Sequence, residues 1–65
     1  MKIIVNGEPQ DTRARTLQEL CAALGLGDLK VATAVNGDFV PAAARDAHTL
    51  EQDDKVEIVS PRQGG

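Results

Sequence analysis

The sequence predicts an α+β fold: a mixed sheet of about five strands with one main helix packed across one face. Two Asn-Gly dipeptides each follow a β-branched run, which is typical of two hairpins. Between them lies one segment whose apolar residues have helical spacing. A chain of 65 residues makes one small domain, and about a quarter of its residues are Leu, Ile, Val or Phe, which is enough for it to fold. We expect this domain over residues 1–60.

The first predicted hairpin lies at the start of the chain. Residues 2–5 form an apolar, β-branched run that we expect to be a strand turning at Asn6-Gly7, since both positions of a type I′ turn need positive φ. A weaker second strand is expected at about 10–14. Pro9 has no N–H to donate, so this strand is predicted to begin late and to lie at an edge.

The main helix is predicted over residues 17–24. Thr16 and Glu19 have the spacing of a capping box, in which each side chain accepts a hydrogen bond from the backbone N–H of the other. Gly25 suits the left-handed position that ends a helix. The apolar residues fall on one face, namely Leu17, Leu20, Cys21 and Leu24.

The second predicted hairpin follows the helix. Residues 31–35 alternate apolar residues on one face, and the strand is expected to turn at Asn36-Gly37 into a short strand at 39–40. The alanines at 42–44 predict either a single helical turn or a loop.

The last predicted strand covers residues 55–60. Val56 and Ile58 are expected to face the core, with Glu57 and Val59 facing outward. The first and last strands are the most apolar, so we expect them to lie parallel at the centre of the sheet.

Composition excludes several classes of function. The net charge of −3 is a poor match to nucleic acid, whose partners need a surplus of Lys and Arg. The apolar run at residues 3–5 is too short for a signal peptide or a membrane span, so no membrane partner and a cytoplasmic location are expected. A self-sufficient enzyme is disfavoured by the small size, and no catalytic residue is assigned.

The chemistry is expected in the tail over residues 61–65, where the chain reads Pro-Arg-Gln-Gly-Gly. Glycines have no Cβ, so such a tail can pass through a narrow channel. The reactive group it presents is the α-carboxylate of Gly65, which becomes an electrophile once ATP has converted it to an acyl adenylate. The glycines lie at turns or in the tail and form no phosphate-binding loop. Activation must therefore come from another protein, and no cofactor is expected on this chain.

Four segments together resemble the ThiS-type thiamine sulfur carrier proteins. They are VNGE at 5–8, TLQEL at 16–20, AVNGDFVP at 34–41 and KVEIVSPRQGG at 55–65. The resemblance covers essentially the whole chain and implies a β-grasp, ubiquitin-like fold. Asp53 stands where the family usually has Gly before the last strand, and Asp tolerates the left-handed region at modest cost.

The resemblance also implies a reaction cycle and its partners. A ThiF-type adenylyltransferase, using ATP and Mg, adenylates Gly65. A sulfur donor, such as a cysteine desulfurase system, then converts the adenylate to a thiocarboxylate. A ThiG-type thiazole synthase takes this sulfur into the thiazole ring of thiamine.

Three alternatives remain at this point. The small subunit of molybdopterin synthase has the same fold, a terminal Gly-Gly and the same thiocarboxylate, although those chains are usually longer. A ubiquitin-like modifier would join Gly65 to lysines of other proteins. A non-covalent binding module would dock through its surface while the tail stays idle.

Further residues are candidates for contact with a partner. In the tail, Gly64 is the threading neighbour of Gly65, and Arg62 and Gln63 either contact the partner's channel or are merely solvated. On the sheet, period-two alternation turns Phe39 outward if its neighbour faces the core. With Val59 and Ala34 it would form an apolar docking patch; the alternative is a Phe39 folded over the rim of the core.

The remaining polar and sulfur-containing side chains have structural interpretations. Cys21 lies on the apolar face of the helix and is expected to pack in the core rather than to relay sulfur. His48 is alone, so no metal site is expected. Asp53 and Asp54 are expected to form a turn.

Overall fold

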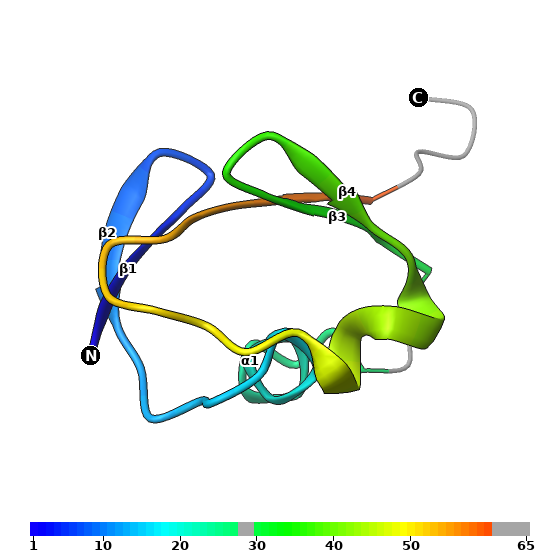
Figure 1. Ribbon diagram of the computed structural model, residues 1–65, viewed down its shortest axis with the longest axis horizontal. Coiled ribbons are helices and arrows are strands. Elements are labelled where there is room, and N and C mark those ends of the chain that lie inside the picture. Colours follow the sequence, from blue (N-terminus) through cyan, green and yellow to red (C-terminus); the bar gives the residue numbers. More distant parts are fainter. Residues whose placement is uncertain (28–29, 61–65) are drawn as a thin grey trace.

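The computed structural model describes residues 1–27 and 30–60, and the predicted tail over 61–65 lies outside them. Five strands form one mixed sheet in the order β2-β1-β5-β3-β4, so the α+β prediction is confirmed. Helix α1 and the 3₁₀ helix η1 lie together on one side of the sheet (Figure 1). The elements are β1 (Lys2–Val5), β2 (Glu8–Asp11), α1 (Leu17–Ala23), β3 (Ala32–Val35), β4 (Asp38–Val40), η1 (Ala42–Ala47) and β5 (Lys55–Val59).

Strand β5 lies at the centre of the sheet, between the two hairpins (Figure 1). It pairs in parallel with β1, where Val5 lies opposite Val56, and antiparallel with β3, where Ala32 lies opposite Val59. The predicted parallel pair of first and last strands is therefore confirmed. The alternation along β5 is also as predicted, since Val56 and Ile58 are buried.

Strand β2 begins and ends earlier than the predicted range of about 10–14. The chain turns after Asp11, where the Ala14 N–H donates to Thr12 Oγ1 at 3.0 Å and Ala14 enters the core. Strand β2 is an edge strand, as expected, but it starts at Glu8 and contains Pro9, which lies opposite Ile4. Glu8 and Val5 flank the two-residue turn and form its hydrogen-bonded pair, so the next pair along is a non-hydrogen-bonded one. The ring nitrogen of Pro9 consequently points away from β1, and the missing N–H removes no rung of the ladder.

Helix α1 is capped at both ends, by side chains at its start and by backbone hydrogen bonds at its end. The Thr16 hydroxyl accepts from the Glu19 N–H at 3.2 Å, as predicted, but the Glu19 carboxylate accepts from the Arg15 N–H at 2.7 Å instead of the Thr16 N–H. At the other end Gly25 has φ +77 and Leu26 donates to the Cys21 carbonyl, which completes a Schellman motif. The reciprocal cap thus spans one residue more than the sequence pattern suggested.

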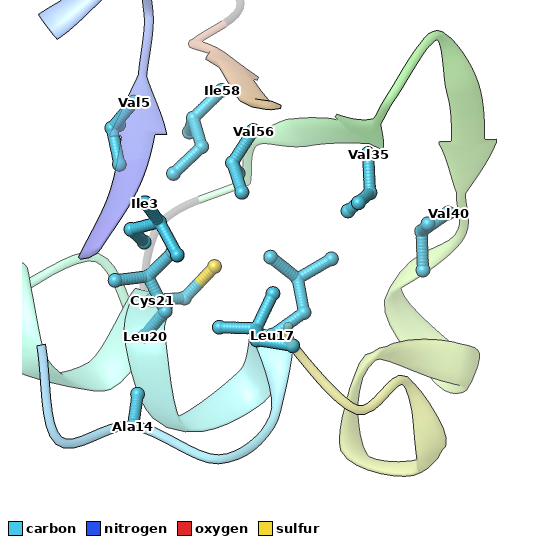
Figure 2. Close-up of a cluster of buried hydrophobic side chains, with 11 residues drawn as sticks. Ile3, Val5, Ala14, Leu17, Leu20, Cys21, Val35, Val40, Val56 and Ile58 are labelled. Atoms are coloured by element: carbon cyan, nitrogen blue, oxygen red, sulfur yellow. The ribbon is translucent and has the colours of Figure 1, made fainter. Parts of the chain in front are cut away.

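The hydrophobic core fills the space between the sheet and α1. Figure 2 shows the strand side chains pointing toward those of the helix, among them the thiol of Cys21. The buried apolar residues are Ile3, Val5, Ala14, Leu17, Leu20, Cys21, Val35, Val40, Leu50, Val56 and Ile58. Because this core lies on one side only, the other face of the sheet is left open.

Candidate functional site

The open face of the sheet carries an apolar patch at the end where β5 finishes. Phe39 is 68% exposed and Val59 is 62% exposed, both pointing away from the core. Phe39 lies opposite Ala34 and Val59 lies opposite Ala32 in the strand register. We define Ala32, Ala34, Phe39 and Val59 as the sheet patch. Three of these were predicted as outward residues; Ala32 was missed, although it shares the period-two face of Ala34.

Phe39 does not fold over the rim of the core. Its neighbour Val40 is 5% exposed and takes the inward position on β4. The backbone therefore turns Phe39 to the opposite face, where it leaves a large aromatic surface in contact with water. Such exposed apolar area on a small domain is typical of an interaction surface.

A carboxylate borders the sheet patch. Glu57 lies opposite Ala34 on the same outward face of β5, between Lys55 and Val59. Asp38 begins β4 immediately before Phe39 and is exposed. The patch therefore combines an apolar centre with negative charge beside it.

Two asparagine side chains hold β5 at its two ends. Asn6 Oδ1 accepts from the Ile58 N–H at 2.8 Å, and Asn6 Nδ2 donates to the Ile58 carbonyl at 3.0 Å. At the start of the strand, Asn36 Oδ1 accepts from the Lys55 N–H at 3.0 Å. The sequence indicated only turns at these positions. Their contacts with β5 join residues far apart in the chain, which a local pattern does not reveal.

A buried arginine supports the patch from the inside. Arg45 is 8% exposed; its Nε donates to Thr33 Oγ1 at 3.0 Å and its Nη2 donates to the Val31 carbonyl. The Thr33 hydroxyl in turn donates to the Val40 carbonyl at 2.7 Å. This network ties η1 to β3 and β4 directly beneath the sheet patch. No local pattern indicated this network, because Arg45 follows an alanine run that carries no motif.

Cys21 is placed in the core, not at a reactive surface. It is 1% exposed, and burial raises the pKa of the Cys21 thiol above its ordinary value, an effect that the Arg45 guanidinium only partly offsets. The thiol is therefore protonated at neutral pH and is a poor nucleophile. Core packing is the role that this environment supports.

The other polar candidates have backbone roles. The His48 carbonyl accepts from the Leu17 N–H at 3.0 Å. Asp53 takes φ +68 in the turn before β5, and Asp54 accepts from the Glu51 N–H at 2.8 Å. In the part of the chain that the structure describes, no group of three or more His, Cys, Asp or Glu side chains could hold a metal ion.

The predicted tail residues cannot be placed from the described part of the chain. Gly65, Gly64, Gln63 and Arg62 all lie outside it. Ser60, the last residue described, follows directly on Val59 of the sheet patch. Any group carried on the residues after Ser60 therefore starts from the edge of this patch.

A five-stranded mixed sheet with a central last strand, folded around one helix, defines the ubiquitin-like β-grasp class. A crystal structure of the thiamine biosynthesis protein ThiS from Geobacter metallireducens matches with a TM-score of 0.80 and 33% identity, over 100% of both chains. An NMR structure of a thiamine biosynthesis protein from the same organism matches with a TM-score of 0.80 and 30% identity, over 100% of this chain and 88% of that one. The ThiS family model matches residues 3–65. The chain belongs to the ThiS family.

A curated relative is a thiazole synthase from Magnetococcus marinus, 39% identical over 66 residues. The match covers 100% of this chain and 20% of the relative, so the chain spans about a fifth of that protein's length. In the described residues, no helix has the length and apolar character that crossing a membrane would need.

Proposed function

We propose that this chain is a sulfur carrier in thiamine biosynthesis. Its membership of the ThiS family over residues 3–65 is the observation that carries the proposal. The family and the two matching structures favour the thiamine pathway over the sister pathway to molybdopterin. The chain is proposed to act as a protein co-substrate, with the chemistry performed by its partner enzymes.

Gly65 is proposed to carry the sulfur. On a ThiF-type adenylyltransferase, the Gly65 carboxylate attacks the α-phosphate of ATP. This forms an acyl adenylate and releases pyrophosphate. ATP and Mg belong to that enzyme and not to this chain. The terminal sulfur of a persulfide on a sulfur donor, such as a cysteine desulfurase system, then attacks the acyl carbon and displaces AMP. A thiol reduces the resulting acyl disulfide, breaking its S–S bond and leaving a thiocarboxylate on Gly65. We propose a cytoplasmic location, where ATP and these partners occur together.

The sheet patch is proposed to dock on the activating enzyme. Phe39 and Val59 offer apolar area, and Glu57 adds a negative charge that favours a partner with a complementary basic residue. Docking here would start the tail at the partner's surface, because Ser60 leaves the sheet beside Val59. Gly64, Gln63 and Arg62 would then lie in the partner's channel.

A ThiG-type thiazole synthase is proposed as the receiver of the sulfur. Support comes from the thiazole synthase of Magnetococcus marinus, in which a segment similar to this chain forms part of the same polypeptide. Proteins that act in sequence are often found joined in one chain. The resemblance is therefore what is expected if a carrier of this type serves thiazole synthase.

The intact mass of the chain tests the carrier role. The 65-residue protein is incubated with a ThiF-type enzyme, ATP, Mg and a sulfur donor. We expect the mass to change by the replacement of one oxygen atom by one sulfur atom. A variant without Gly65 should stay unmodified, while Gln18→Ala, at an exposed position on helix α1, should still be modified. An unchanged mass of the full chain, with a known carrier modified in parallel, would contradict the proposal.

A further inference from the structure

We propose that Asn6 is a positioning residue for the reactive carboxylate, because its side chain holds the last rung of β5, from which the tail starts. The inference rests on the proposed sulfur-carrier function. It goes beyond that function by assigning a role to a residue in the first hairpin, which is 59 positions from Gly65 in the sequence.

The first step concerns the end of β1. The parallel pairing of β1 with β5 ends where Val5 lies opposite Val56, because the chain then turns away at Asn6 and Gly7. The Asn6 backbone N–H donates to the Val56 carbonyl at 2.9 Å, so this side of β5 faces β1. Two residues later, the N–H and the carbonyl of Ile58 face the same side, beyond the end of β1.

The second step is that the Asn6 amide replaces the missing strand. A side-chain amide has one acceptor and one donor group, as a backbone peptide has. Asn6 uses both on Ile58, accepting from its N–H at 2.8 Å and donating to its carbonyl at 3.0 Å. The side chain therefore extends the parallel ladder by one rung, after the backbone of β1 has left the sheet.

The third step concerns the residues after Ile58. Val59 lies opposite Ala32 of β3 on one side, while β1 has already ended on the other. Among residues 1–27 and 30–60, the Asn6 contact to Ile58 is thus the last hydrogen-bonded contact on that side of the strand. It fixes the direction in which the chain continues from Ile58 and the point at which Ser60 leaves the sheet.

The consequence concerns the reach of Gly65. If Val59 and Ser60 separated from the sheet, the length of chain between the sheet and Gly65 would grow by about 7 Å, at about 3.5 Å per residue. A docked carrier would then hold its carboxylate over a wider volume, and misplacement of a reacting group by about 1 Å can cost about a hundredfold in rate. Asn6 is therefore expected to act on the rate of activation after docking.

Asn36 provides a matched control within the same chain. Both residues precede a glycine in a hairpin turn, with φ +51 at Asn6 and φ +52 at Asn36. Both side chains bond to β5, but Asn36 bonds to the N–H of Lys55 at the start of the strand. Substituting either residue by glycine preserves the positive φ and removes only the side chain.

The first measurement is hydrogen exchange of the backbone amides of β5 in Asn6→Gly and Asn36→Gly. Loss of the two hydrogen bonds to Ile58 should lower the protection of its amide by about tenfold in Asn6→Gly. The Ile58 amide should keep its protection in Asn36→Gly. Asn6→Asp, which keeps the size and the acceptor but loses the donor, serves as a second variant if Asn6→Gly does not fold.

The second measurement is the rate of thiocarboxylate formation, using the ThiF-type enzyme with ATP, Mg and sulfide as the sulfur source. We expect kcat to fall by about tenfold in Asn6→Gly with KM changed much less, and both to stay near wild type in Asn36→Gly. A general loss of stability would slow the two variants alike, so equal slowing would overturn the proposal. A normal kcat in a variant that has lost Ile58 protection would also overturn it.

The same experiment separates this inference from the proposed function. If the wild-type chain is not modified at all, the sulfur-carrier function fails, and the positioning role fails with it. The exchange measurement still decides whether Asn6 holds Ile58. If the wild type is modified and Ile58 keeps its protection in Asn6→Gly, the carrier function stands and the role of Asn6 is wrong.

Discussion

Phe39 is the side chain whose exposure most clearly indicates a role in docking rather than in folding. It contributes little to the core, because 68% of its surface is exposed, while its neighbour Val40 is buried. An aromatic residue in this setting adds contact area to an interface at low entropic cost. The prediction that Phe39 faces outward depended on the register of one short strand, and a shift by one residue would have reversed it.

Replacing Phe39 with alanine should weaken docking while leaving the fold intact. The free energy of unfolding should change by less than about 0.5 kcal/mol, because the side chain is exposed. The Kd for a ThiF-type enzyme should rise by about tenfold or more, as it does at interface hot spots. Calorimetric titration measures it, with Leu24→Ala on the helix side as control. Equal affinity of the Phe39→Ala variant and the wild type would remove the sheet patch from the interface.

Cys21 makes stability depend on pH in the alkaline range. Burial raises the pKa of its thiol in the folded chain above the ordinary value of 9.0, so the folded state binds this proton more tightly than the unfolded state does. The contribution is fully present below pH 9.0 and is lost as pH rises through the folded-state pKa. Urea unfolding between pH 7 and 10 should show this loss in the wild type and a smaller one in Cys21→Ala. If the free energy of unfolding changed with pH identically in the wild type and in Cys21→Ala, the contribution of the Cys21 thiol would be contradicted.

At the scale of the elements, the sequence predicted what short-range patterns control. The helix, its Thr16 cap and both Asn-Gly turns were found because their signals lie within a few residues. The early start of β2 was missed because a proline is tolerated there only if its ring nitrogen points away from β1, which depends on the strand register. The hydrogen bonds of Asn6 to Ile58 and the Arg45 network were missed because the partners are distant in the sequence. Long-range hydrogen bonds leave no local pattern.

The cap of α1 is open to a direct test. Thr16→Ala removes the acceptor for the Glu19 N–H and should destabilise the domain by about 1 kcal/mol. Thr16→Ser keeps the hydroxyl and should lie close to the wild type. Urea denaturation followed by circular dichroism measures the difference. Equal stability of the alanine and serine variants would show that the cap contributes nothing.

At the scale of the whole molecule, the fold separates two tasks. One face of the sheet is covered by α1 and η1 and supplies stability, while the open face carries the sheet patch (Figure 1). The central strand β5 serves both, since Val56 and Ile58 pack inward and Val59 faces outward. The fold could be predicted almost entirely from the sequence. The roles of the tail residues stay predictions, because they lie outside the described part of the chain.

The most direct test of the account is to follow the sulfur itself. The chain is converted to its Gly65 thiocarboxylate with radioactive sulfur, purified, and mixed with a ThiG-type thiazole synthase and its small-molecule substrates. The account predicts that the label leaves the protein and appears in the thiazole, and that no label is delivered by a chain lacking Gly65. Label that stays on the protein, or protein that becomes linked to lysines of other proteins, would contradict it.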